Sequence, residues 1–148
     1  MSSVKTNQPF LALSKICLNN WHYIDQKVLS FNDGINFFTG HSGSGKSTVI
    51  DAMQIVLYAN TDGRGFFNKA AADDSDRNLI EYLRGMVAVG EKDEVTYLRN
   101  KNFSTTIVLE FTQTESEEKE CLGVVFDVDT GRNDTSRLFF WHKGGILE

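Results

Sequence analysis

The residues Gly40-His41-Ser42-Gly43-Ser44-Gly45-Lys46-Ser47 match the spacing G-x-x-x-x-G-K-[ST] of a phosphate-binding loop. The glycines let the backbone turn tightly and approach phosphate oxygens without a clash from a Cβ atom. Lys46 is expected to contact the β- and γ-phosphates and is the candidate catalytic residue. The hydroxyl of Ser47 is the expected Mg²⁺ ligand. Together with Thr48, which follows them, these residues form the predicted nucleotide-binding site.

The residues on both sides of this motif fit a phosphate-binding loop. Residues 35–39 (INFFT) predict a buried strand, and residues 48–58 predict a helix with Val49, Met53, Val56 and Leu57 on one face. A strand, such a loop and then a helix direct backbone N–H groups and the positive helix end toward a phosphate chain. The pattern therefore predicts binding of a nucleoside triphosphate with Mg²⁺, and no motif separates ATP from GTP.

Length and composition narrow the class of protein. A chain of 148 residues corresponds to one domain or to part of one. Its net charge of −5 is unlike that of a free-standing nucleic-acid-binding protein, which usually carries a basic face. No apolar run reaches the length of a membrane span, and the N-terminus lacks the apolar core of a secretory signal. The two Cys and three His lack metal-ligand spacing, so reduced thiols in a cytosolic protein are expected.

The remaining pattern predicts an α/β P-loop fold with one β-rich half. Residues 1–9 are expected to be a flexible N-terminus, and residues 10–148 one lobe. Two strands, at 10–18 and 27–31, form a predicted hairpin that leads through a turn at 32–34 into the strand before the loop. A second helix is expected at 76–84, with Leu79, Leu83 and Met86 on one side and Gly85 as its stop. Four further strands are expected at residues 95–99, 105–111, 121–128 and 138–141.

These last strands predict an antiparallel meander without helices, because polar turns alone join them. One of the connections is the acidic run at residues 115–120, which is expected to be a solvated turn. A small P-loop kinase or GTPase would instead continue with parallel strands joined by helices.

Asp127 is the one candidate for the second Mg²⁺-organising carboxylate that a P-loop NTPase needs, because it follows the apolar residues 122–126. The alternative is a purely structural residue at the end of a meander strand. We favour the structural interpretation, because no helical crossover precedes this strand to bring it parallel to the strand before the loop.

The motif continues as GKSTVIDAMQIVL at residues 45–57, and the Asp-Ala pair after G-K-S-T resembles the SMC and RecF group of ATPases. The segment LNNWHYI at residues 18–24 is similar to the corresponding region of MukB-like and Wadjet-type proteins. Residues 67–71, residues 76–85 and the Phe139-Phe140-Trp141 strand look most like the Wadjet subgroup with its JetC- and MksB-type proteins. The resemblance covers residues 10–145. One departure is Ser42, where this group often has Asn.

This resemblance implies the N-terminal lobe of a split ATPase head that binds ATP and Mg²⁺. In such proteins a long coiled coil separates this lobe from a C-terminal lobe, which supplies the signature motif and the Walker B carboxylates. The resemblance further implies three partners: a second copy bound head to head around ATP, a kleisin-type subunit and duplex DNA. It also implies a cytoplasmic, nucleoid-associated localisation in a bacterium. Its expected roles are chromosome maintenance, DNA repair or plasmid defence. The isolated chain is expected not to hydrolyse ATP.

Three other interpretations stay open at this point. One is a stand-alone small P-loop NTPase or kinase that uses Asp127 as its Walker B carboxylate. Another is a RecF- or RecN-like repair ATPase, which shares the same lobe. The third is a module that binds phosphate and hydrolyses nothing.

Several residues outside the loop have both a functional and a structural interpretation. Trp21 and His22 are candidates for contact with the nucleotide base, or else for packing in the core. The loop cations Arg64 and Lys69 are candidates for contact with phosphate or DNA, or else are solvated. Arg77 and Arg84 are hypothesised to anchor the second helix to the nucleotide-side surface.

Overall fold

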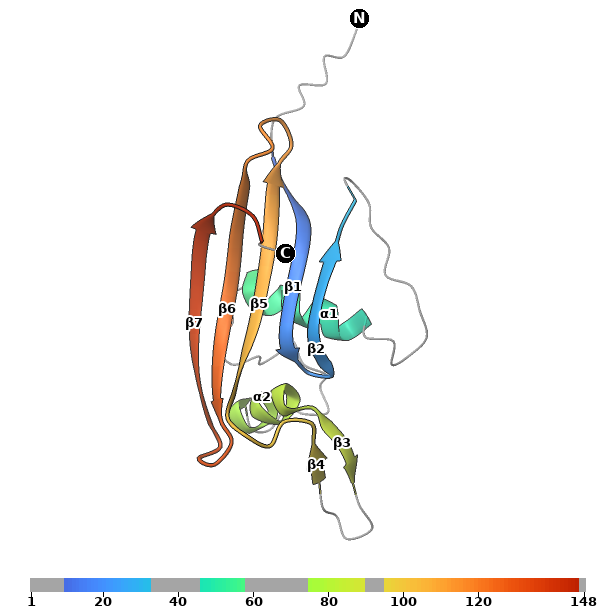
Figure 1. Cartoon of the computed structure of the whole chain (residues 1–148), viewed down its shortest axis with the longest axis vertical. Helices are drawn as coiled ribbons and strands as arrows, with labels where there is room; N and C mark the ends of the chain where they lie inside the picture. Colours follow the sequence, from blue (N-terminus) through green and yellow to red (C-terminus); the bar gives the residue numbers. More distant parts are fainter. Residues whose placement is uncertain (1–9, 33–45, 58–74, 90–94, 147–148) are drawn as a thin grey trace, which may run out of the picture.

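The computed structural model describes residues 10–32, 46–57, 75–89 and 95–146 (Figure 1). Its elements follow one another as β1 (Leu11–Trp21), β2 (Ile24–Ser30), α1 (Lys46–Leu57), α2 (Ser75–Arg84), β3 (Met86–Val89), β4 (Val95–Tyr97), β5 (Phe103–Gln113), β6 (Lys119–Asp129) and β7 (Asp134–Lys143). The predicted strand at 35–39 and most of its preceding turn lie outside the described residues, so a parallel strand that bears the loop stays a prediction.

Five strands form one antiparallel sheet in the order β2-β1-β5-β6-β7. The predicted N-terminal hairpin is confirmed as β1 and β2, and three of the four predicted meander strands as β5, β6 and β7. The fourth, at residues 95–99, is wrongly placed, because β4 pairs with β3 in a separate two-stranded sheet. β1 joins the two parts of the sheet because it pairs with both β2 and β5. The described part of the chain is therefore mostly antiparallel sheet with two short helices.

The hydrophobic core lies between one face of this sheet and the two helices, and Figure 1 shows α1 behind the sheet. Alternate side chains of a strand point to opposite faces. The buried Ile107 of β5 is paired with Val124 of β6, and the buried Leu109 is paired with Ile16 of β1. The helices bury apolar side chains against this face, namely Val49, Ala52, Ile55 and Val56 of α1 and Leu79, Ile80 and Leu83 of α2.

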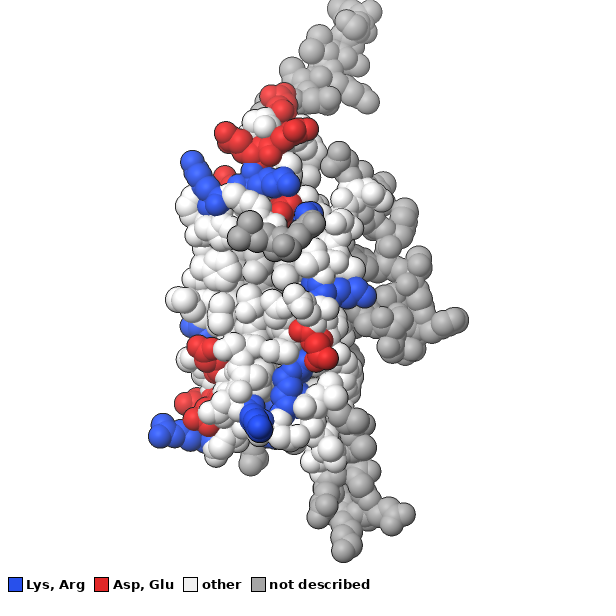
Figure 2. Space-filling view, viewed as in Figure 1, with Lys and Arg blue, Asp and Glu red and all other residues white. Residues whose placement is uncertain are grey.

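The opposite face of the sheet points toward the viewer in Figure 2, where a broad central area carries few charged side chains. Acidic and basic side chains alternate toward the two ends of the strands instead. The described residues on this face therefore form no continuous basic patch of the kind that binds nucleic acid.

Gly85 ends α2 as predicted. It has a φ of +71°, its N–H bonds to the carbonyl of Glu81, and an added Cβ would lie 3.0 Å from the carbonyl oxygen of His22. A residue with a side chain would therefore be strained at this position. The prediction that Met86 belongs to the apolar side of this helix is wrong, because Met86 begins β3 and is partly exposed. Strand β3 itself was not predicted.

Most of the acidic run forms a solvated hairpin turn, as expected, and its last two residues, 119–120, begin β6. Residues 115–118 are exposed between β5 and β6, and Glu117 has a φ of +58°. Both cysteines are free thiols, although Cys17 is only half-buried whereas Cys121 is fully buried.

Glu110 is a buried carboxylate of β5 with an exposed fraction of 1%. It accepts hydrogen bonds from the Ser14 hydroxyl at 2.7 Å and from the Ile146 N–H at 2.9 Å, and Lys119 lies 3.9 Å away. Burial alone would raise the pKa of this carboxyl, but the two hydrogen bonds and the lysine charge hold the pKa below its ordinary value.

We predict that Glu110→Gln lowers the free energy of unfolding at pH 7 by about 2 kcal/mol, because hydrogen bonds to a charged group are lost. The folded pKa is depressed, so this contribution is present above the ordinary value of 4.5 and is lost as pH falls through the folded value. Urea unfolding of parent and variant at pH 7 and at acid pH measures both effects. The exposed Glu118→Gln is the control, and equal losses for the two variants at pH 7 would contradict the prediction.

Candidate functional site

The candidate site lies at the N-terminal end of α1, where the phosphate-binding motif joins the helix. α1 begins at Lys46, two residues before the predicted start. Gly40 to Gly45 lie outside the described residues, as do the side chains of Lys46 and Ser47. The first turn of α1 holds no acidic residue, so no carboxylate of its own competes there for an anion. Unpaired N–H groups and the helix dipole make such a helix end suitable for phosphate.

Trp21 at the end of β1 contacts the first turn of α1. Its side chain is 0% exposed, and its indole N–H donates a 2.8 Å hydrogen bond to the carbonyl oxygen of Thr48. Of the two hypotheses for Trp21, packing in the core is therefore the one that the structure supports. The residue still bears on the site, since it contacts the residue that follows Ser47.

Tyr82 of α2 contacts both the first and the second turn of α1, through Thr48 and Asp51. Its hydroxyl donates to Asp51 Oδ2 at 3.3 Å and is hydrogen bonded to the side chain of Thr48. Burial raises the pKa of Tyr82, and the nearby Asp51 charge raises it further. Burial also raises the pKa of the Asp51 carboxyl, against the opposing effect of the hydrogen bond from Tyr82. Tyr82 was not predicted to matter, because on α2 it resembles any half-buried aromatic residue.

His22 packs against α2. Its ring stacks on Tyr82 with centroids 4.1 Å apart and an interplanar angle of 8°, and its Nδ1 lies 3.1 Å from the Tyr82 carbonyl oxygen. Burial lowers the pKa of this imidazole below its ordinary value, which favours a neutral ring at pH 7. The structure thus supports a packing role for His22.

Arg84 joins α2 to the segment after β4. It donates to the Arg99 carbonyl oxygen at 3.0 Å and to Asn100 Oδ1 at 3.3 Å, and its guanidinium lies 4.0 Å from the centre of the Tyr97 ring. These described contacts are with the β4 region rather than with the nucleotide-side surface, so the hypothesis for Arg84 is corrected. Arg64, Lys69 and the side chain of Arg77 lie outside the described residues.

Arg99 is a structural hub that no sequence pattern had indicated. Its guanidinium donates to the carbonyl oxygens of His22 and Leu83, both at 2.6 Å, and to that of Ile24 at 3.1 Å. It thereby links the corner between β1 and β2 to the end of α2. Arg99 also forms an ion pair with the exposed carboxylate of Asp25 at 3.3 Å. Because the other three partners are backbone carbonyls, no residue type in the sequence indicates them.

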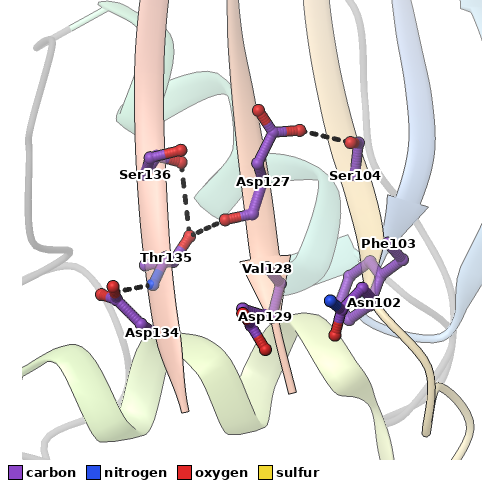
Figure 3. A pocket seen from close by; sticks show the side chains of 9 residues that line it. All are labelled: Asn102, Phe103, Ser104, Asp127, Val128, Asp129, Asp134, Thr135 and Ser136. Carbon is purple, nitrogen blue, oxygen red and sulfur yellow. Dashed lines mark hydrogen bonds between the residues drawn. The ribbon is translucent and has the colours of Figure 1, made fainter. Parts of the chain in front are cut away.

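Asp127 lies in β6 between Ser104 of β5 and Ser136 of β7, and it accepts a hydrogen bond from the Ser104 hydroxyl (Figure 3). β6 is antiparallel to both neighbours. The buried Phe126 and Val128 on either side of Asp127 face the helices, so Asp127 points to the other face of the sheet. The sheet lies between the Asp127 carboxylate and α1. This position argues against a Walker B role for Asp127 and supports the structural interpretation.

A shallow pocket of about 410 Å³ surrounds Asp127 near the ends of β5, β6 and β7 (Figure 3). Its lining consists of Asn102, Phe103, Ser104, Asp127, Val128, Asp129, Asp134, Thr135 and Ser136, with no residue of α1. Among the described residues, no three His, Cys, Asp or Glu side chains are grouped so that they could hold a metal ion. The pocket is therefore separate from the candidate phosphate site.

Residues 13–74 match the family model described as the P-loop containing region of AAA domain. The match covers most of β1, all of β2, the motif at residues 40–47 and α1. None of the curated proteins matches the chain. The chain therefore contains a P-loop region, the kind that binds nucleoside triphosphates. In the described part of the chain, no helix is long and apolar enough to cross a membrane.

Proposed function

We propose that this chain is the ATP- and Mg²⁺-binding N-terminal lobe of an SMC-like ATPase head that acts on DNA. The observation that carries the proposal is the start of α1 directly at Lys46, with its first turn packed on an antiparallel sheet. A P-loop helix covered by such a sheet differs from the repeated βα units of small P-loop kinases and GTPases.

The loop residues hold the triphosphate in this proposal. Backbone N–H groups of residues 40–47 and the N-terminal end of α1 surround the phosphates, and Lys46 adds a point charge to them. The Ser47 hydroxyl ligates Mg²⁺, which neutralises charge that develops on the phosphates. The absence of an acidic residue from the first turn of α1 fits an anionic ligand.

A second lobe fits the exposed side of α1. The helix is apolar on more than one face: Val49, Ala52 and Ile55 are buried against the sheet, whereas Ile50 is 39% and Leu57 53% exposed. A helix that is apolar nearly all round is usually covered on both sides. We propose that the C-terminal lobe of the complete protein packs there and supplies the missing Walker B carboxylates.

The wider assembly is part of the same proposal. A second copy would close the nucleotide site head to head, and a kleisin-type subunit and duplex DNA would be the other partners. We assign the DNA contact to the assembly, because the net charge is −5 and the described residues on the face in Figure 2 form no continuous basic patch.

We predict that Lys46→Ala weakens Mg²⁺–ATP binding about 10- to 100-fold, the equivalent of a lost charge-assisted hydrogen bond at roughly 1.4 kcal/mol per tenfold. Calorimetric titration of the parent and the variant, with and without Mg²⁺, measures the change. Lys101→Ala, which removes an exposed lysine away from α1, is the matched control and should bind like the parent. Equal affinity of the parent and Lys46→Ala would contradict the proposal, and competition by GTP would report base preference.

A further inference from the structure

Two side chains from distant parts of the sequence hold the first turn of α1. Trp21 of β1 donates to the Thr48 carbonyl oxygen at 2.8 Å. Tyr82 of α2 donates its hydroxyl hydrogen to Asp51 at 3.3 Å and is also hydrogen bonded to the Thr48 side chain, which acts as donor to the tyrosine oxygen. The result is a chain of hydrogen bonds from Thr48 through Tyr82 to Asp51.

These contacts restrict how the helix can rotate about its own axis. Thr48 and Asp51 are three positions apart, so they lie on the same side of α1. A single hydroxyl that bonds one residue in the first turn and one in the second therefore fixes which way this side of the helix start faces. The backbone N–H groups at residues 46–48 belong to the same rigid turn, so their direction is fixed with it. Binding groups held in place before the ligand arrives bind more tightly than groups that must be ordered on binding.

The Tyr82 hydroxyl is separable from the packing of the Tyr82 ring. The ring stacks on His22 with centroids 4.1 Å apart and lies 5.0 Å from the Trp21 ring. Removal of the oxygen leaves these ring contacts in place. The hydrogen bonds of the Tyr82 hydroxyl are not needed for packing, since a phenylalanine ring would fill the same space.

We propose that Tyr82 is a positioning residue for triphosphate binding, which it supports by orienting the first turn of α1 through Thr48 and Asp51. This inference rests on the proposed function, because it concerns the same phosphate site. It assigns a role to α2, an element that lies after the residues matched by the P-loop family model.

The test compares Tyr82→Phe with the matched control Tyr23→Phe. Tyr23 belongs to the same cluster, with its ring 3.9 Å from His22, but its hydroxyl donates to the Met86 carbonyl oxygen rather than to α1. Titration with Mg²⁺–ATP is expected to show about 5- to 10-fold weaker binding for Tyr82→Phe, the loss of one hydrogen bond, and less than about twofold change for Tyr23→Phe. Urea unfolding is expected to give similar midpoints for both variants.

A spectroscopic signature separates positioning from general stability. The chain has two tryptophans, so Trp141→Phe leaves Trp21 as the sole indole, in contact with the first turn of α1. ATP is expected to change the emission of Trp21 in this background. The change should occur at higher ATP concentration when Tyr82→Phe is added.

Asp51 provides a second route should Tyr82→Phe prove unstable. Asp51→Asn keeps an oxygen that accepts from the tyrosine, so its affinity should stay closer to the parent than that of Asp51→Ala. Parent-like affinity for both Tyr82→Phe and Asp51→Ala, with Lys46→Ala still weak, would overturn the positioning role and leave the proposed function intact. Failure of the parent to bind ATP at all would overturn both.

Discussion

If the proposed SMC-like head is correct, ATP turnover by the 148-residue chain alone is expected to be at least about 1,000-fold slower than turnover by a head completed with the proposed C-terminal lobe. Phosphoryl transfer needs a second carboxylate for the metal and a group that positions the attacking water, and the loop supplies neither. In the described part of the chain, Asp127 is separated from α1 by the sheet. Phosphate-release assays on the chain with and without the C-terminal lobe measure the difference.

Asp127→Asn is the control for this expected result. The substitution should leave the turnover of the complete head unchanged, because the Asp127 side chain points away from α1 and bonds Ser104. Robust turnover by the lone chain that disappears in Asp127→Asn would contradict the half-head proposal. It would instead support a stand-alone small NTPase with Asp127 as its Walker B carboxylate.

Trp21→Ala is expected to lower the free energy of unfolding by about 3–5 kcal/mol, the usual cost of truncating a buried large aromatic residue. Trp21 is fully buried, packs on Tyr82 and bonds the Thr48 carbonyl, so its removal opens a cavity where β1 and both helices meet. This is a large share of the roughly 5–15 kcal/mol that stabilises an ordinary domain. Urea unfolding followed by far-ultraviolet circular dichroism measures the loss.

The second tryptophan provides the matched control. Trp141 in β7 is 54% exposed, and its indole N–H donates to Glu120 at 3.2 Å. Its substitution by alanine should cost less than about 1 kcal/mol, the typical value of one net hydrogen bond at a surface. A loss for Trp141→Ala equal to that for Trp21→Ala would contradict the packing role of Trp21 in the core.

If Trp21→Ala still folds, its nucleotide affinity is informative for the proposed function. The variant loses the hydrogen bond to Thr48 together with the packing below α1, so weaker ATP binding alone would not separate positioning from stability. The hydroxyl-only change at Tyr82 makes that separation, because both rings and their contacts remain. The two substitutions therefore address different properties of the same turn.

The local pattern of the sequence was enough to predict most of the elements. Alternation of apolar residues located β1, β2, β5, β6 and β7, although each observed strand differs from its prediction by a few residues at one or both ends. The ends are harder to predict because strand length depends on the partner strand, as with Phe103 of β5, which is paired with Val128. β3 was missed because it has only four residues, directly after the end of α2. So short a segment does not show the alternation of apolar and polar residues that identifies a strand.

The motif at residues 40–47 and its continuation into α1 were evident from the sequence, because phosphate binding requires glycines, a lysine and a hydroxyl at fixed spacing. The surroundings of that helix were decided only by the tertiary structure. Trp21, Asp51 and Tyr82 are far apart along the chain, and nothing in their local patterns relates them. They meet because the antiparallel order of the sheet places the β1–β2 corner in contact with both α1 and α2. Likewise, Asp127 faces away from α1 because pairing with β5 fixes the register of β6, and a shift of one residue would turn the carboxylate toward the helices.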